Sequence, residues 1–186
     1  GIELVIHAAA LKIVPALEYD PGEAIKTNVL GALNVVDAAL ATPSVRRVIG
    51  VSTDKASAPL ILYGATKLCM ERLFVAANAL AGADGARFAC VRYGNVTGSR
   101  GSVVQVWRAA AEAGEPLQVT DPAATRFWMP LDEAVSFVLS SLARIRATPT
   151  HASDSGARVA SSTCALARHR STTRCGLRAS ITCTRN

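Results

Sequence analysis

Residues 45–92, VRRVIGVSTDKASAPLILYGATKLCMERLFVAANALAGADGARFACVR, contain the pattern that decides the fold. Short runs of β-branched and apolar residues, at 45–52 and 87–92, are typical of buried strands. The longer stretch between them, from Tyr63 to about Ala79, predicts a helix. Because a strand, a helix and a strand in succession form a βαβ unit, we predict an α/β fold with a parallel sheet.

The same alternation continues on both sides of this segment. Upstream, Ile2–His7 (IELVIH) predicts a strand that ends in small residues. A helix should follow over Ala24 to Ala39, because Asp20 is a suitable N-cap, with Pro21 and Glu23 in its first turn. Downstream, the expected elements are a helix over 103–113, a short strand over 117–120 and a helix over 131–144. Together they predict a doubly wound, Rossmann-like sheet.

A complete dinucleotide-binding domain has a glycine-rich fingerprint after its first strand, and no such motif occurs here. Gly94, Gly98 and Gly101 follow a late strand and are more typical of an ordinary glycine-rich loop. We therefore expect the N-terminal strands to be missing from this chain. Residues 1–146 are interpreted as the C-terminal part of an NAD(P)-binding Rossmann-like domain with substrate-binding elements.

Residues 147–186 differ in kind from the rest. From Thr148 onward they hold six arginines, no lysine and a single acidic residue, and the large apolar residues are few. Such a segment buries too little surface to offset the entropy of ordering it, so we expect a disordered tail or the product of a shifted reading frame. Because the net charge of +6 belongs mostly to this tail, the basicity does not predict a nucleic-acid partner.

Composition excludes several other classes. At 50% hydrophobic and 18% charged residues, the 186-residue chain can bury one core. No apolar run approaches the roughly 20 residues of a membrane span, and the first residues lack a secretory signal, so we expect a cytoplasmic protein without a membrane partner. None of the five cysteines forms a CxxC pair, which argues against a metal site, and Cys69 and Cys90 are predicted to be buried thiols.

The strongest chemical signal is Tyr63 with Lys67. Residues four apart lie on one face of a helix, so the ammonium can lower the pKa of the phenol and also reach a cofactor ribose. Alone, the pair can arise by chance on any helix. Ser52 and Thr53 end the preceding strand, and a hydroxyl, a phenol and an ammonium together suit alcohol oxidation by a nicotinamide cofactor.

Asp54 and Lys55 follow Thr53 at the carboxyl end of a predicted parallel strand, where ligands of such sheets bind. An acid and a base beside a redox pair suit a reaction that combines hydride transfer with proton transfer. The alternative is a solvated loop with two opposite charges. For His7, we expect a strand-end histidine whose polar atoms are satisfied by the backbone.

Five motifs in order carry a resemblance to a known family: HAAALKIVPALEYDP, IKTNVLGALNVVDAA, VSTDKASAPLILYGATKLCMERLF, VRYGNVTGSRGSV and TRFWMPLDEAVSFVL. Over about residues 3–146, the chain resembles the inverting UDP-N-acetylglucosamine 4,6-dehydratases. These are extended short-chain dehydrogenases/reductases of the polysaccharide biosynthesis (CapD-like) family. Tyrosine in LYGATK favours the inverting subgroup, whose product feeds pseudaminic acid synthesis.

The resemblance implies a lyase that oxidises the sugar at C4, removes water across C5 and C6, and returns the hydride to C6 with inversion at C5. It implies Tyr63, activated by Lys67, as the base at C4, with Thr53 hydrogen-bonding there. Lys55, when neutral, is the implied base at C5, and Asp54 the acid at C6. The competing interpretations are a nucleotide-sugar 4-epimerase, which needs no acid–base pair at Asp54 and Lys55, and an inactive fragment of such an enzyme.

The resemblance also implies how ligands are held. The cofactor would be NADP, with NAD as the alternative, and the substrate a UDP-N-acetyl sugar. We expect a homo-oligomer in the full-length protein. The implied cofactor-binding residues are Ala8, Ala9, Lys12, Ser52, Tyr63 and Lys67. The implied substrate-binding residues are Asn95, Val96, Thr97, Gly98, Ser99, Arg100 and Arg126.

Overall fold

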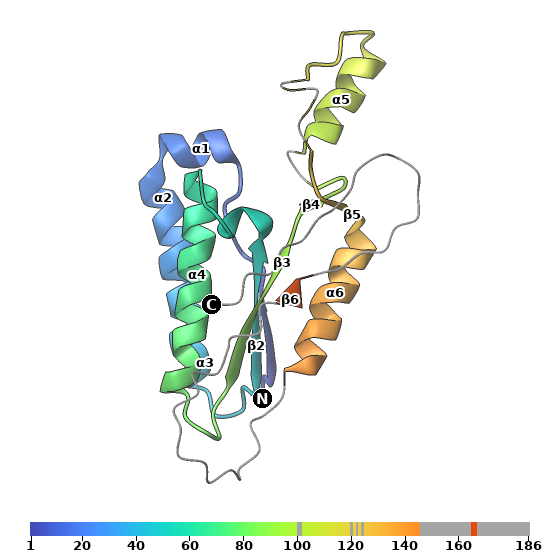
Figure 1. The fold of residues 1–186 in the computed structure, drawn as a ribbon. Helices are drawn as coiled ribbons and strands as arrows, with labels where there is room; N and C mark the ends of the chain where they lie inside the picture. The colour runs from blue at the N-terminus through green and yellow to red at the C-terminus, as the bar shows by residue number, and fades with distance from the viewer. Residues whose placement is uncertain (100–101, 120, 122, 124, 146–164, 167–186) are drawn as a thin grey trace.

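A four-stranded parallel sheet forms the centre of the computed structural model, which describes residues 1–99, 102–119, 121, 123, 125–145 and 165–166 (Figure 1). The strand order is β1 (Leu4–His7), β2 (Arg47–Thr53), β3 (Arg87–Tyr93) and β6 (Ala165–Leu166). All three pairings are parallel. The predicted α/β fold with a parallel sheet is therefore confirmed.

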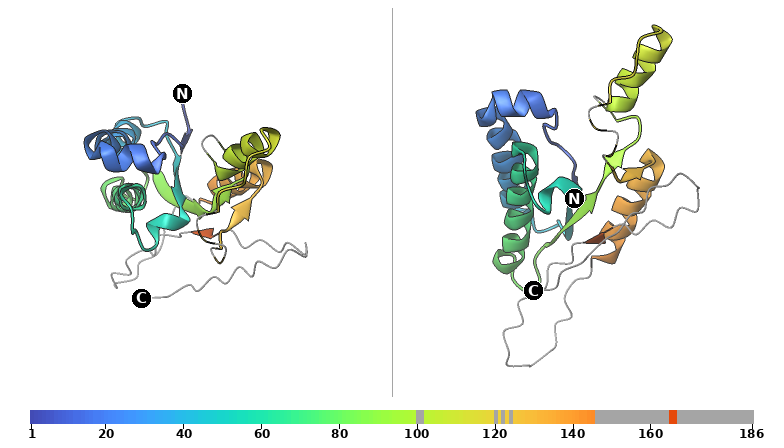
Figure 2. Two further views of the ribbon diagram at one scale, coloured as in Figure 1. Left: turned by 90° about the horizontal axis from the view of Figure 1, so that it is seen from above. Right: turned by 45° about the horizontal axis from the view of Figure 1, so that its top comes forward.

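Helices cover both faces of this sheet (Figure 2). One face carries α1 (Val14–Tyr19), α2 (Pro21–Ile25), the π-helical turn η1 (Lys26–Leu30), α3 (Gly31–Leu40) and α4 (Leu62–Leu80). The other face carries α6 (Leu131–Arg144), which contacts β2 and β3. Within the described residues, none of these helices combines the length and the apolar content that crossing a bilayer requires.

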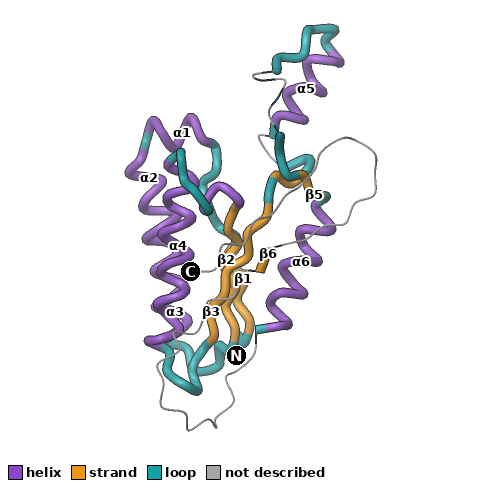
Figure 3. The backbone as a smooth tube through the Cα atoms, viewed as in Figure 1, coloured by secondary structure: helices purple, strands orange, loops and turns teal. Residues whose placement is uncertain are grey.

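A smaller unit extends beyond the carboxyl end of β3 (Figure 3). It consists of a two-stranded parallel sheet, β4 (Asn95–Val96) with β5 (Trp128–Met129), and of helix α5 (Val103–Glu112). Helix α5 stands away from the main body and contains no buried residue. The chain therefore builds one compact layer structure and a projecting arm next to the strand ends.

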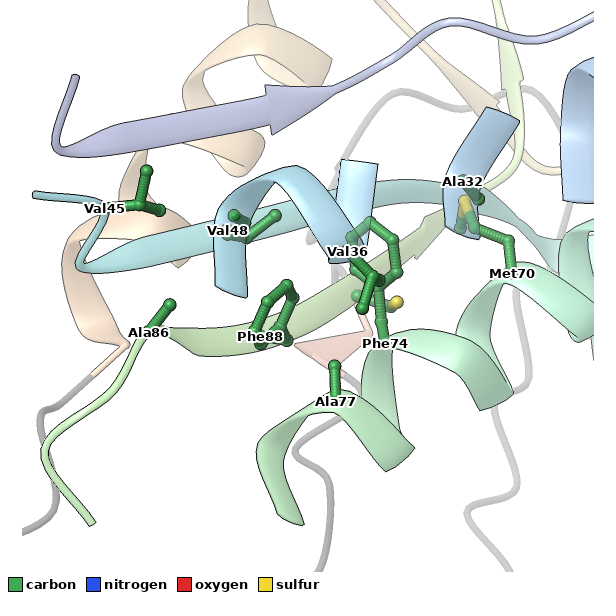
Figure 4. Packing of buried hydrophobic residues seen from close by; sticks show 11 residues of the cluster. Ala32, Val36, Val45, Val48, Met70, Phe74, Ala77, Ala86 and Phe88 are labelled. Atoms are coloured by element: carbon green, nitrogen blue, oxygen red, sulfur yellow. The ribbon is translucent and has the colours of Figure 1, made fainter. Parts of the chain in front are cut away.

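Alternation along β2 divides the core into two clusters. Val48 packs against α3 and α4, together with Phe74 and Phe88, whose rings meet edge to face at 5.8 Å (Figure 4). Its neighbour Ile49 packs on the opposite side against Val138 of α6. Burying each such side chain stabilises the fold by about 1.5–3 kcal/mol, so both helical layers are anchored to the sheet.

Several expectations need correction. The helix predicted over 24–39 is interrupted by the π turn η1. Leu117–Val119 form an exposed loop instead of a strand, because no strand of the described chain pairs with them. Cys69 is exposed on α4, since it lies on the face turned away from the sheet. The predicted tail lies outside the described residues except for β6, and its boundary stays a prediction.

Candidate active site

The candidate residues gather at the carboxyl edge of the sheet, because consecutive parallel strands all end there. The loop after β1 carries Ala8, Ala9 and Lys12. β2 ends at Thr53 and continues into the 3₁₀ turn η2 (Asp54–Ala56). Tyr63 and Lys67 lie in the first two turns of α4. Asn95–Ser99 follow the end of β3.

Four of these side chains form one hydrogen-bonded network. Thr53 Oγ1 donates to Asp54 Oδ1 at 2.9 Å, and Lys55 Nζ donates to the same oxygen at 3.0 Å. Lys55 Nζ also donates to Asn95 Oδ1 at 3.1 Å, which joins the β2 turn to β4. Lys55 is therefore held by two partners in a partly buried position, which distinguishes it from a freely solvated loop charge.

Gly64 brings the first turn of α4 against this network. A Cβ atom at this position would lie 2.4 Å from the carbonyl oxygen of Lys55, so only glycine allows the approach. The same helix end is fixed from α1, where Glu18 Oε1 accepts a hydrogen bond from the backbone N–H of Leu62 at 2.8 Å. Tyr63 is thereby held next to the Asp54–Lys55 turn.

Burial governs the phenol of Tyr63. Burial, together with the smaller effects of Tyr93 and Asp54, raises the pKa of Tyr63 to about 12. The expectation that Lys67 lowers this pKa is therefore wrong for this structure. Lys67 is not among the groups that shift this pKa, and its Nζ donates to Met70 Sδ at 3.3 Å.

Lys67 is itself buried, with 2% of its surface exposed. Burial lowers the pKa of its ammonium to about 8, against opposing effects of Cys90 and Glu71. Its neutral form is consequently accessible near physiological pH, whereas that of an exposed lysine is not.

His7 departs from its predicted role. Its side chain is buried and its ring lies 5.9 Å from that of Phe74. Nε2 has no hydrogen-bond partner among the described residues, so the expected satisfaction by the backbone is not found for this atom. Burial lowers the pKa of His7, and the nearby Lys67 lowers it further.

Sequence reasoning missed Asn28, which organises the loop after β1. This residue is 1% exposed and lies in the π turn η1. Its side chain accepts from Leu11 N at 2.8 Å, donates to Leu11 O at 2.9 Å and donates to Thr66 Oγ1 at 3.1 Å. Because Asn28 follows two other polar residues, Lys26 and Thr27, its sequence context gave no signal of burial. Asn28 thus ties the predicted cofactor loop to α4.

Ser52 and the loop after β4 show further contacts. The hydroxyl of Ser52 donates to Glu71 Oε1, so its cofactor contact stays a prediction. Lys12 Nζ donates to Ser99 Oγ at 3.1 Å, which brings a predicted cofactor residue to a predicted substrate residue. Gly98 has a φ of +73°, which suits the turn after Val96.

The remaining predicted substrate residues are less connected. Thr97 is exposed, and its backbone N–H donates to Met129 O at 3.0 Å. Arg126 is exposed, and its guanidinium donates to the Thr125 carbonyl at 2.7 Å, so no bond joins it to the network. Arg100 lies outside the described residues.

The carboxyl edge fits a nicotinamide cofactor better than a metal. Ala8 and Ala9 expose small side chains beside the buried Nε2 of His7, and Lys67 lies close enough to influence that ring. Small residues and an unpaired polar atom leave room and a polar contact for a planar ligand. In the described part of the chain, no group of three His, Cys, Asp or Glu side chains could hold a metal ion.

Comparison with known proteins gives a family match. The family model described as polysaccharide biosynthesis protein matches residues 1–177. A UDP-N-acetylglucosamine 4,6-dehydratase (inverting) from Campylobacter jejuni is 52% identical over 145 residues, which cover 77% of this chain and 43% of the relative. A UDP-glucose 4-epimerase from Rickettsia prowazekii is 47% identical over 140 residues, 75% of this chain and 40% of the relative.

A solved structure supports the same architecture. MoeE5 in complex with UDP-glucuronic acid and NAD superimposes with a TM-score of 0.69 at 26% identity, covering 78% of this chain and 53% of MoeE5. The chain spans less than half the length of the two relatives named above. Its Rossmann-like fold is shared with MoeE5, which was solved with NAD and a nucleotide sugar bound.

Proposed function

We propose, because this chain belongs to the polysaccharide biosynthesis protein family, that the protein is a nucleotide-sugar 4,6-dehydratase acting on UDP-N-acetylglucosamine. The observation that carries the proposal is the placement of Lys55. Its ammonium contacts both Asp54 and Asn95, next to the helix end that carries Tyr63. An acid–base pair at this position serves an elimination and has no role in simple epimerisation.

Elimination needs a base at C5 and an acid at C6, and the Asp54–Lys55 pair can provide both after one proton transfer. Moving one proton along their 3.0 Å hydrogen bond yields a neutral Lys55 and a protonated Asp54, without changing the total charge. Lys55 then takes the proton from C5, and Asp54 gives its proton to the departing C6 hydroxyl, so that water leaves. The 4-ketone formed earlier makes the C5 proton acidic.

A nicotinamide cofactor, NADP or NAD, would be held by the loop that carries Ala8, Ala9 and Lys12, and it would supply reversible hydride transfer, so that the overall reaction involves no net oxidation. Tyr63 takes the proton from the C4 hydroxyl. Because burial favours the neutral phenol, this step relies on the ammonium of Lys67, one helical turn away on α4, to stabilise the phenolate. Thr53, at the end of β2, would hydrogen-bond at C4.

Ligand positioning follows the same edge. We assign Ala8, Ala9 and Lys12 to the cofactor side, where Asn28 orders their loop. Residues 95–99 would line the sugar side, and Arg126 would face the diphosphate, since arginine binds phosphate in a bidentate manner. Reprotonation of C5 on the opposite face gives the inverted UDP-2-acetamido-2,6-dideoxy-4-hexulose. A cytoplasmic location and a homo-oligomer belong to this proposal.

The product distinguishes this proposal from the epimerase alternative, which the similarity to the Rickettsia protein favours. Activity should be measured on a protein that contains this sequence and has the full length of the relatives. We call it the relative-length protein. With UDP-N-acetylglucosamine and NADP, we expect a 4-keto product whose mass is lower by one water. A product of unchanged mass that differs only at C4 would instead establish the epimerase.

A further inference from the structure

A partly buried ion pair contacts both sides of the turn that carries Asp54 and Lys55. Glu71 of α4 and Arg92 of β3 form it, with Arg92 Nε donating to Glu71 Oε1 at 2.7 Å and Arg92 Nη2 donating to Oε2. The carboxylate side chain is 9% exposed and the guanidinium side chain 19%. Such a two-pronged contact fixes the orientation of both side chains as well as their distance.

The pair holds both ends of the turn. Ser52, which precedes the turn, donates through Oγ to Glu71 Oε1. Ser57, which follows it, accepts from Arg92 Nη1 at 3.1 Å. Arg92 lies beside Ser52, because the two residues are register partners in the β2–β3 pairing. The catalytic turn is therefore spanned by side-chain hydrogen bonds from one ion pair.

We propose that Glu71 and Arg92 are positioning residues that hold the turn between Ser52 and Ser57, and with it Asp54 and Lys55, in its reactive geometry. Both act through the turn, because their side chains contact each other, Ser52 and Ser57. The effect on elimination rests on the proposed function, whereas the effect on the turn does not. Arg92 also provides the positive charge that a buried carboxylate needs.

The first test measures amide hydrogen exchange in the 186-residue chain. Arg92→Lys keeps a positive charge near Glu71 but loses the fork that also reaches Ser57. Exchange at the amides of Lys55 and Ser57, which donate to Thr53 Oγ1 and Asp54 O, should become about tenfold faster or more, the effect of losing one charge-assisted hydrogen bond. Exchange in the centre of β2 should stay unchanged.

Arg87→Lys is the matched control. Arg87 begins the same strand, and its guanidinium contacts the Gly82 and Ala83 carbonyls at the opposite end of the sheet. This variant should leave the turn amides unaffected. Ser57→Ala, at an exposed residue, removes only the outer contact and should accelerate the same amides by about threefold or more. Turn exchange within twofold of Arg87→Lys in both test variants would overturn the proposal.

The second test separates positioning from a merely structural role in the relative-length protein. Arg92→Lys should lower kcat for dehydration by about tenfold or more, while KM for UDP-N-acetylglucosamine stays within about twofold. A raised KM with unchanged kcat would contradict the positioning role. If the wild type performs no dehydration, the proposed function fails, and the exchange experiment still decides whether the ion pair holds the turn.

Discussion

Gly64→Ala tests whether α4 and the Asp54–Lys55 turn are packed as closely as described. An alanine Cβ would lie 2.4 Å from Lys55 O, whereas ordinary contact begins at 3.4 Å, so the turn or the helix must move by about 1 Å. Overpacking of this kind costs about 1–3 kcal/mol, and the helix propensity of alanine returns up to about 1 kcal/mol. If alanine returns the full 1 kcal/mol, the net loss in unfolding free energy should be up to about 2 kcal/mol.

Gly31→Ala is the matched control, because a Cβ there meets Lys26 O at an ordinary 3.6 Å. This helical substitution should stabilise the chain by about 0.5–1 kcal/mol. Urea unfolding of the 186-residue chain measures both changes. In the relative-length protein, Gly64→Ala should also lower dehydration by about tenfold or more, the usual result of a misplacement of this size near reacting groups. Equal stability of the two variants would refute the close packing.

Three further predictions concern buried polar groups in the 186-residue chain, each measured by denaturant unfolding. Lys67→Met should raise the unfolding free energy at pH 7 by up to about 3 kcal/mol, because folding lowers the pKa of the lysine to about 8. For the same reason, the unfolding free energy of the wild type should rise between pH 8 and pH 10.5. The Lys67→Met variant should lack this rise. His7→Phe should not destabilise the chain at pH 7, because it keeps a ring against Phe74 and removes the unpaired Nε2. Since the pKa of His7 is lowered from 6.5, wild-type stability should fall as the pH drops below that value, and the variant should lose this dependence. Asn28→Ala should cost about 2–4 kcal/mol, because it leaves the Leu11 N–H and carbonyl unpaired, whereas Asn34→Ala, at an exposed position of α3, should change stability by less than about 0.5 kcal/mol.

The sequence pattern predicted those helices and strands whose signal lies within the segment itself. The predicted helix over 131–144 matches α6, and the strands at 45–52 and 87–92 match β2 and β3 within two residues. The signal lies in their own sequence, as a helical period over 131–144 and as short β-branched, apolar runs in the two strands. The π turn could not be predicted in this way, because it accompanies hydrogen bonds between Asn28 and Leu11, which lie 17 residues apart. The β4–β5 pair likewise depends on distant partners, such as Asn95 N donating to Phe127 O.

The site was predictable where topology decides it. Thr53, Asp54, Lys55 and Asn95 meet because parallel strands end at one edge, and their order in the sequence contains that information. The pKa of Tyr63 depends first on burial and then on Tyr93, and the YxxxK spacing contains information on neither. Glu71 and Arg92 were missed because charged residues on a helix and a strand normally indicate a solvated face.

Solvent deuterium incorporation at C5 of the sugar in the Lys55→Ala variant of the relative-length protein tests the central claim most directly. If Lys55 is the base at C5, the variant should still bind NADP and UDP-N-acetylglucosamine. Both C5 exchange and dehydration should then fall by about 10²-fold or more, the scale of a lost general base. Retention of C5 exchange with near-normal dehydration would contradict the account, because Lys55 would then be a loop charge without a catalytic role.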